Sequence, residues 1–183
     1  MELEEELITG CCKKDRKAQR KLYDLYAGQM LVVAMRYVKA QDEAEDILQE
    51  AFIKVFKNIE TFRKESSLFF WIKKILVNTA LNHQRSKLYM YPMVDVDEMR
   101  SLQQQETTLS GYRYQELLGF IHRLPDGCRV IFNLFAIEGY GHKEIAKMLN
   151  ISEGTSKSQY SRARLLLKEM INSEDELRYG TFK

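Results

Sequence analysis

Apolar residues recur at helical spacing in three stretches of the first half of the chain. The stretches lie within residues 22–37, 44–55 and 69–79, and in each the apolar positions repeat every three or four residues. Only two prolines and nine glycines occur in the 183 residues, so few positions interrupt a helix. The pattern predicts a small helical bundle that ends near Lys87.

The pattern changes over residues 88–112. This stretch contains Pro92, three consecutive glutamines and a net charge of −3. Such a composition is typical of a polar, flexible linker and gives little apolar surface to bury. We therefore expect a boundary between two domains here.

Helical spacing returns after residue 112 and stops at Pro125. Asp126 is expected to cap a further helix that runs through Ile137, and Gly139 can end that helix. The predicted fold is all-α, with two small helical domains over residues 1–87 and 113–183 joined by the linker.

Residues 142–170 have the pattern of a helix-turn-helix. A short helix carries Ala146, a small residue that lets two helices approach closely. Asn150 stands where a sharp turn requires a residue that tolerates positive φ. Ser152 is a typical N-cap for the longer helix that follows. In this arrangement the second helix enters a DNA major groove.

The second helix has two different faces. At 100° per residue, one side is mostly apolar and is expected to pack inward: Ser156, Gln159, Tyr160, Ala163, Leu166, Leu167 and Met170. The other side carries cations and short polar groups: Lys157, Ser158, Ser161, Arg162, Arg164 and Lys168. Cations suit phosphates, and short polar groups suit base edges. The alternative is an amphipathic surface helix whose basic face is merely solvated.

An acidic stripe is expected on the helix over residues 44–56. It consists of Asp46, Gln49, Glu50 and Ile53, and residues 41–50 hold five acids and no base. Such a face repels DNA. Many acidic faces are simply solvated, but an isolated isoleucine among acids favours contact with a protein.

The net charge changes sign over residues 63–87, which contain six cationic residues and one acidic residue. Five residues are expected on one side of this helix: Trp71, Lys74, Asn78, Asn82 and Arg85. Aromatic and amide groups among cations suit single-stranded nucleic acid, because unstacked bases need a ring surface and polar partners. The alternative is that Phe69, Phe70 and Trp71 belong to the core.

The remaining composition excludes several classes of protein. The N-terminus lacks the basic start and apolar stretch of a secretory signal, and no apolar run approaches the ~20 residues that span a bilayer. We expect a cytoplasmic protein. The three cysteines and three histidines show no metal-ligand spacing, and we find no catalytic arrangement. No cofactor, metal or enzymatic activity is expected.

Several linked motifs now resemble one family, the extracytoplasmic-function (ECF) sigma factors of bacterial RNA polymerase. The resemblance to their second conserved region rests on residues 37–52, which include Ala44-Glu45-Asp46-Ile47-Leu48-Gln49-Glu50-Ala51-Phe52, and on residues 62–85. The resemblance to their fourth region rests on Leu124-Pro125, Glu144-Ile145-Ala146 and Gly154-Thr155-Ser156-Lys157-Ser158 through Arg164.

The resemblance implies a role for each face. The acidic stripe would dock on the clamp helices of the largest polymerase subunit, and the basic helix would open the −10 element of promoter DNA. The −35 element would be read by Thr155, Lys157, Ser158, Ser161 and Arg162. An anti-sigma factor, often anchored in the membrane, would hold the protein inactive.

Two positions depart from the family pattern. Ser156 replaces a residue that is often aliphatic, which predicts looser packing under the second helix, and Gln159 replaces a residue that is often basic. Two rival functions stay open from the residues alone. One is a stand-alone helix-turn-helix regulator of duplex DNA, which would not need the acidic stripe or the basic aromatic helix. The other is an enzyme of unknown type.

Overall fold

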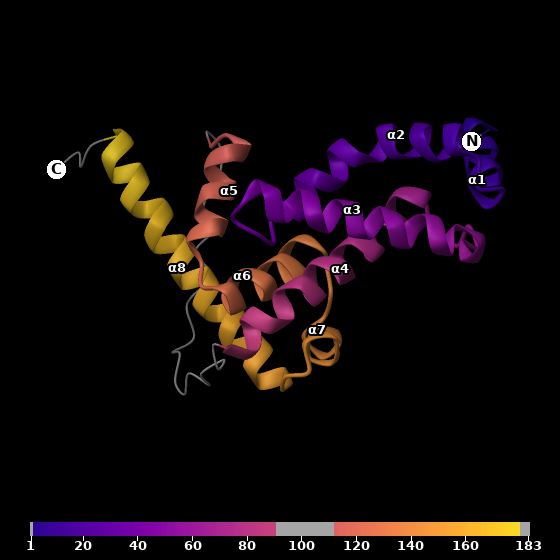
Figure 1. Cartoon of the computed structure of the whole chain (residues 1–183). Coiled ribbons are helices and arrows are strands. Elements are labelled where there is room, and N and C mark those ends of the chain that lie inside the picture. The colour runs from indigo at the N-terminus through magenta and orange to yellow at the C-terminus, as the bar shows by residue number, and fades with distance from the viewer. Residues whose placement is uncertain (1, 91–111, 180–183) are drawn as a thin grey trace. The chain divides into compact units, whose positions relative to one another are not determined.

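The computed structural model describes residues 2–90 and 112–179, and every regular element within them is a helix (Figure 1). The all-α prediction is therefore confirmed. Most of the predicted linker, residues 91–111, lies outside the described residues. The chain divides into two compact units, Met1–Gln84 and Arg85–Lys183, and each is described by itself.

The first unit is built on two long helices that lie side by side, α2 and α3 (Figure 1). Its elements are α1 (Glu2–Cys12), α2 (Arg16–Ala34), α3 (Gln41–Asn58), the short 3-10 turn η1 (Ile59–Thr61) and α4 (Leu68–Met90), whose residues 85–90 fall in the second unit. The apolar positions that predicted α2 and α3 form the core between them: Leu22, Tyr26, Met30, Val33, Ala44, Ile47, Leu48, Ala51, Phe52 and Val55.

Helix α1 is an element that the sequence patterns did not predict. It buries Leu7 and Cys11 and packs across the start of α2. The approach is close at Gly10, where an added Cβ would stand only 2.5 Å from Cβ of Ala18. The hydroxyl of Tyr26 donates a hydrogen bond to the Glu4 carboxylate of α1.

Helix α4 buries one side over residues 68–84. The buried residues are Leu68, Ile72, Leu76, Val77, Thr79, Ala80, Leu81 and Gln84. Two long-range hydrogen bonds fix its orientation. The Lys54 ammonium of α3 donates to the Thr79 hydroxyl at 3.2 Å, and the Gln84 amide donates to the Tyr37 carbonyl at 3.1 Å. The opposite side of α4 is therefore left for other contacts.

The second unit surrounds one long helix, α8 (Glu153–Tyr179). The others are α5 (Tyr114–Arg123), α6 (Asp126–Phe132), the π-helical turn η2 (Asn133–Ile137) and α7 (His142–Leu149). Both α6 and α7 pack against α8. The centre of this packing is formed by Leu124, Cys128 and Ala163, with Phe132, Leu166, Leu167 and Met170 against them.

In the segment after Pro125, the predicted end of the helix is correct and the predicted cap is wrong. The helical segment runs to Ile137, and Gly139 follows with φ of +80°, as expected. Asp126, however, is the first residue of α6 and not its cap. Its carboxylate instead pairs with the guanidinium of Arg129, which is buried and also donates to the Leu124 carbonyl. Burying the Arg129 charge without a partner would be costly, so the Asp126 carboxylate pairs with it.

Candidate functional site

The turn between α7 and α8 has the geometry that its residues predict. Asn150 lies in the left-handed region, with φ 55° and ψ 49°. The Ser152 hydroxyl accepts a hydrogen bond from the backbone N–H of Thr155 at 2.9 Å. Two of the sharpest sequence predictions, the positive φ and the cap, are thereby confirmed. The helix-turn-helix arrangement follows from them, because they set the direction in which α8 leaves α7.

The first half of α8 separates buried from accessible residues as the helical wheel predicts. Ser156, Gln159 and Ala163 are buried. Lys157, Arg162 and Arg164 are exposed, and Ser158 and Ser161 are half-buried. The Lys157 ammonium pairs with Glu153 one turn earlier, at 2.7 Å. The accessible face of α8 can therefore offer a guanidinium and hydroxyl groups next to one another.

Thr155 does not lie on the accessible face. Thr155 is only 7% exposed, and its hydroxyl lies 2.8 Å from that of Ser152. The family resemblance placed Thr155 among the DNA contacts. Its side chain is instead used inside the N-terminal cap of α8, so its expected contact with a base edge does not fit this structure.

Ser156 makes a polar contact on the inner side of α8. Its hydroxyl oxygen is 2.9 Å from Nδ1 of His142, the first residue of α7. The imidazole in turn stacks on the Phe135 ring, with centroids 4.2 Å apart. The polar pair thus stands where the family often has an aliphatic contact. Ser156 is fully buried, and the looser packing expected here stays a prediction.

Gln159 also faces inward, as expected. Its side-chain oxygen accepts a hydrogen bond from the Cys128 thiol at 3.0 Å. Burial raises the pKa of that thiol, against a smaller opposing effect of the Arg162 charge. Cys128 is therefore a neutral packing residue between α6 and α8.

The environment of His142 favours the neutral imidazole. Burial is the main cause that lowers its pKa below the ordinary 6.5, and the charge of Lys157 lowers it further, while Glu153 acts in the opposite direction. The unfolded chain therefore binds a proton at a higher pH than the folded chain. Below about pH 6.5, stability falls as pH falls, because protonation favours the unfolded state.

We expect this effect in thermal unfolding of the full chain. From pH 7.5 down to pH 5.5, the Tm of the wild type should fall more than that of His142→Phe/Ser156→Ala, which removes both polar partners. The pH range stays above the ordinary titration range of carboxylates. Circular dichroism at several pH values measures the difference. Parallel Tm curves for the two proteins would contradict it.

The acidic stripe lies on the outer side of α3. Asp46, Gln49 and Glu50 are exposed, and the Ile53 residue is 53% exposed. The Glu50 carboxylate pairs with the Lys54 ammonium at 2.7 Å. The structure therefore brings the four predicted residues together on one accessible face, with an apolar side chain at its end.

A shallow hollow of about 240 Å³ adjoins this stripe. It is lined by Tyr23, Ala27, Gly28 and Leu31 of α2 and by Glu45, Leu48 and Gln49 of α3. Gly28 has no atom near the place of a Cβ, so a partner could approach the α2 backbone there. The accessible surface beside Gln49 thus extends from α3 onto α2, which the sequence patterns did not indicate.

The outer side of α4 carries Lys74, Asn78 and Asn82, all exposed and spaced by four residues. Trp71 is half-buried, with its ring centroid 5.5 Å from that of Phe62. The ring packs on Phe62 and is only half-buried, so part of it stays accessible, and its contact with nucleic acid stays a prediction. The side chain of Arg85 lies outside the described residues.

Phe70 was grouped with the possible core residues, but it is 59% exposed. The Lys73 ammonium lies 5.7 Å from its ring centroid, within the range of a cation–π contact. An exposed ring beside a cation adds a stacking surface to this side of the helix. The signal in the sequence was the placement of Phe70 next to Lys73 and Lys74, outside the apolar repeat.

Residues 2–90 and 112–179 contain no group of three metal-ligating side chains. Within the same residues, each helix is too short or too polar to cross a membrane.

Comparison with known proteins identifies two family regions. Residues 22–88 match the family "Sigma-70 region 2", and residues 114–167 match "Sigma-70, region 4". The ECF RNA polymerase sigma-E factor of Haemophilus influenzae is 28% identical over 177 residues, covering 90% of this chain and 93% of the relative. The sigma-E factor of Escherichia coli K12 is 29% identical, covering 86% of this chain and 88% of the relative.

A solved structure supports the fold. The sigma factor RpoE from Bartonella quintana, solved in complex with the anti-sigma factor NepR, aligns with a TM-score of 0.53 and 22% identity. The alignment covers 84% of this chain and 96% of RpoE. With two sigma-70 regions in order and full-length sigma-E relatives, this chain belongs to the sigma-70 family, as a sigma factor of the extracytoplasmic-function group.

Proposed function

We propose that this sigma factor directs core RNA polymerase to promoters through three separate surfaces, on α3, α4 and α8. One observation carries the proposal. The same unit presents an acidic face with an exposed isoleucine on α3 and a face of exposed cations and amides on α4. A protein that only bound DNA would have no use for the acidic face, because phosphates repel it.

The acidic stripe is the proposed docking surface for polymerase. Interfaces concentrate their binding energy in a few central residues surrounded by polar ones. Ile53 with Asp46, Gln49 and Glu50 fits that description. Members of the family dock on the clamp helices of the largest polymerase subunit, and we assign that partner to this stripe.

The outer face of α4 is the proposed promoter-melting surface. Lys74 can contact the backbone, while Asn78 and Asn82 can bond base edges that are exposed when the duplex opens. The half-buried Trp71 offers part of its ring, and Arg85 continues the same helical side by its position. The non-template strand of the −10 element is the proposed ligand.

The accessible face of α8 is the proposed reader of the −35 element. Lys157, Ser158, Ser161 and Arg162 lie near its N-terminal half, which a helix-turn-helix inserts deepest into the major groove. A guanidinium can bond a guanine through two hydrogen bonds, and serine hydroxyls can bond several bases. Thr155 is not included, because its hydroxyl is used in the cap of α8.

The domain roles and the setting follow from the same proposal. Residues 1–87 act as region 2, residues 113–183 as region 4, and residues 88–112 connect them. The protein works in the cytoplasm, where its promoters are, and has no catalytic activity of its own. Since the related RpoE was solved with the anti-sigma factor NepR, we also propose an anti-sigma partner, which a membrane anchor can couple to outside signals.

The proposed function is tested by promoter opening. Core polymerase with this chain should open promoter DNA, which permanganate reports as reactive thymines in the −10 region. Asn78→Ala should slow opening while leaving duplex binding nearly intact, because Asn78 meets bases only after they unstack. Asn172→Ala, an exposed asparagine on the other unit, is the matched control. Normal opening by Asn78→Ala would remove α4 from the proposed melting surface.

A further inference from the structure

A dense basic cluster surrounds the turn between α1 and α2, outside the proposed surfaces on α3, α4 and α8. Residues 13–21 contain six cations and one acid. The cations are all exposed: Lys13, Lys14, Arg16, Lys17, Arg20 and Lys21. We name these six residues the basic cluster. Neither the sigma-70 motifs nor the proposed surfaces account for it.

The four α2 members of the basic cluster share one face of the helix. Positions separated by one, four and five residues lie on adjacent lines of a helix surface. The opposite face is occupied by Ala18 and Leu22, which are buried. The cations therefore point to solvent together and form one continuous strip of charge.

Folding does not benefit from this arrangement. The N-terminus of a helix carries a partial positive charge, so cations there are unfavourable, and α2 has no acid in its first turn. Asp15 caps the helix by accepting from the Lys17 backbone N–H. Like charges four residues apart, such as Lys17 and Lys21, also destabilise a helix.

Little of the charge is neutralised within the chain. Arg20 forms an ion pair with Asp24 at 3.0 Å. Among residues 2–90 and 112–179, the structure gives no ion pair for the other five cations of the cluster. A strip of cations that costs stability and has one internal partner is best explained by an external anion.

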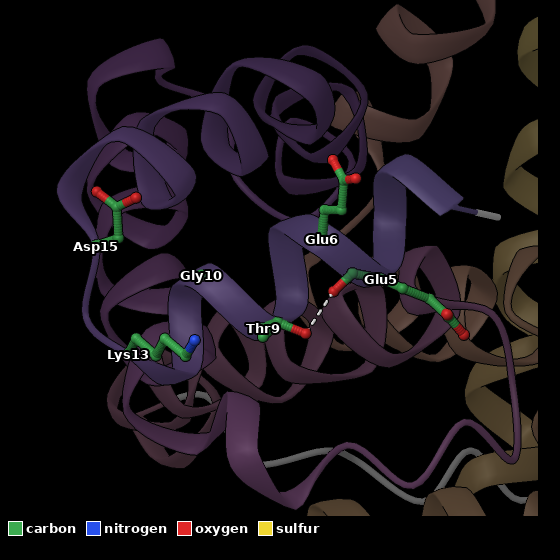
Figure 2. Close-up of a pocket in the computed structure, with 6 residues that line it drawn as sticks. All are labelled: Glu5, Glu6, Thr9, Gly10, Lys13 and Asp15. Carbon is green, nitrogen blue, oxygen red and sulfur yellow. Dashed lines mark hydrogen bonds between the residues drawn. The ribbon is translucent and has the colours of Figure 1, made fainter.

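The neighbouring hollow on α1 is not the place for that anion. Figure 2 shows its lining, which includes Glu5, Glu6 and Asp15 together with Lys13. Three carboxylates would repel an anion, and the Thr9 hydroxyl donates to the Glu5 carbonyl of its own helix. The surface available to the anion is the outer face of α2, where the four cations of that helix are exposed.

We infer that the basic cluster binds the phosphate backbone of promoter DNA beside the −10 element. Duplex DNA presents one charge per ~1.7 Å of axis, which suits a line of cations. A protein partner would need apolar or aromatic residues at the centre of the contact. The one apolar residue within 13–21 is Ala18, and it is buried.

The position of the cluster in its unit supports this ligand. Helix α1 packs on the start of α2 through Gly10 and Ala18. The same helix pairs its Glu5 carboxylate with Lys64 at 2.6 Å, in the segment that leads into α4. Helix α1 thus contacts both the helix that carries the basic cluster and the segment that precedes α4. The inference rests on the function proposed for α4.

The test uses the complete polymerase complex and a duplex promoter at several salt concentrations. Lys17→Gln/Lys21→Gln should weaken binding roughly three- to tenfold at about 0.15 M salt, equally for all promoter sequences. The plot of log K against log salt should flatten by about 0.9 for each phosphate that the protein no longer neutralises, and so by about two for this variant. The Tm should not fall, because a repulsive pair is removed.

Two controls sharpen the result. Lys39→Gln/Arg123→Gln removes two exposed cations elsewhere and should leave binding and slope unchanged. Asp24→Asn releases Arg20 and should act in the opposite direction, with tighter binding and a steeper slope. The same variants are measured for affinity to core polymerase and to vesicles of anionic lipid.

Three outcomes would overturn the inference. They are an unchanged slope in Lys17→Gln/Lys21→Gln, a weaker affinity for core polymerase in place of DNA, and a weakening confined to the lipid vesicles. An unchanged slope in a complex that still opens promoters would remove the basic cluster alone and leave the function proposed for α4 standing.

Discussion

Glu50→Lys combined with Ile53→Ala should weaken the complex with core RNA polymerase by about 1–3 kcal/mol, roughly five- to 150-fold in Kd. The first change reverses a charge in the middle of the acidic stripe. The second removes an apolar side chain from a residue that is 53% exposed in the free chain, and which we expect to be buried on binding. A competition assay against labelled wild type measures the change in affinity.

The control is a charge reversal outside the stripe. Glu60→Lys changes an exposed acid of η1 in the same unit and should leave polymerase affinity close to that of the wild type. Glu50→Lys also places a second cation near Lys54, its present ion-pair partner, so circular dichroism should first show that α3 is intact. Equal affinity for the double variant and the wild type would exclude this face as the docking surface.

Arg162→Ala should relax sequence preference in the −35 element. A guanidinium bonded to a guanine through two hydrogen bonds contributes ~1–3 kcal/mol of discrimination. Arg162 is exposed near the N-terminal half of α8, and the buried Ala163 beside it fixes which side of the helix faces outward. A library of promoters with randomised −35 elements, bound by the polymerase complex, measures the preference.

Lys168→Ala is the comparison for this experiment. Lys168 lies further along α8, beyond the half that a helix-turn-helix inserts into the groove, so it can reach only backbone phosphate. Removing its charge should weaken binding to all sequences alike and lower the salt dependence. If both variants bound every sequence more weakly by the same factor, Arg162 would be a phosphate contact and not a reader of bases.

The turn chemistry of the helix-turn-helix could be predicted because it is local. Whether Asn150 adopts positive φ, and whether Ser152 caps α8, depends on the nature of those residues and on neighbours within a few positions. The same holds for the periodic apolar positions of α2, α3 and α8, since each helix that must bury one face shows that face in its sequence.

The α1 helix and the polar partner of Ser156 on the inner side of α8 could not be predicted in this way. Leu7 and Cys11 are buried because α1 lies across α2, and the sequence patterns did not predict a helix there. The contact of the Ser156 hydroxyl with His142, fourteen residues away, was not indicated by the sequence of either helix. Such pairs depend on how two helices cross, which neither helix encodes alone.

Which residues are accessible was likewise decided by packing. Thr155 and Lys157 are both close to the start of α8, yet Thr155 is buried, with its hydroxyl against that of Ser152, while Lys157 is exposed. Phe70 follows a partly buried phenylalanine and still faces solvent. By itself the sequence determined the helical class, the helix-turn-helix and the charge of each helix. Only the tertiary structure decided which members of each face reach solvent, because burial depends on what neighbouring helices cover.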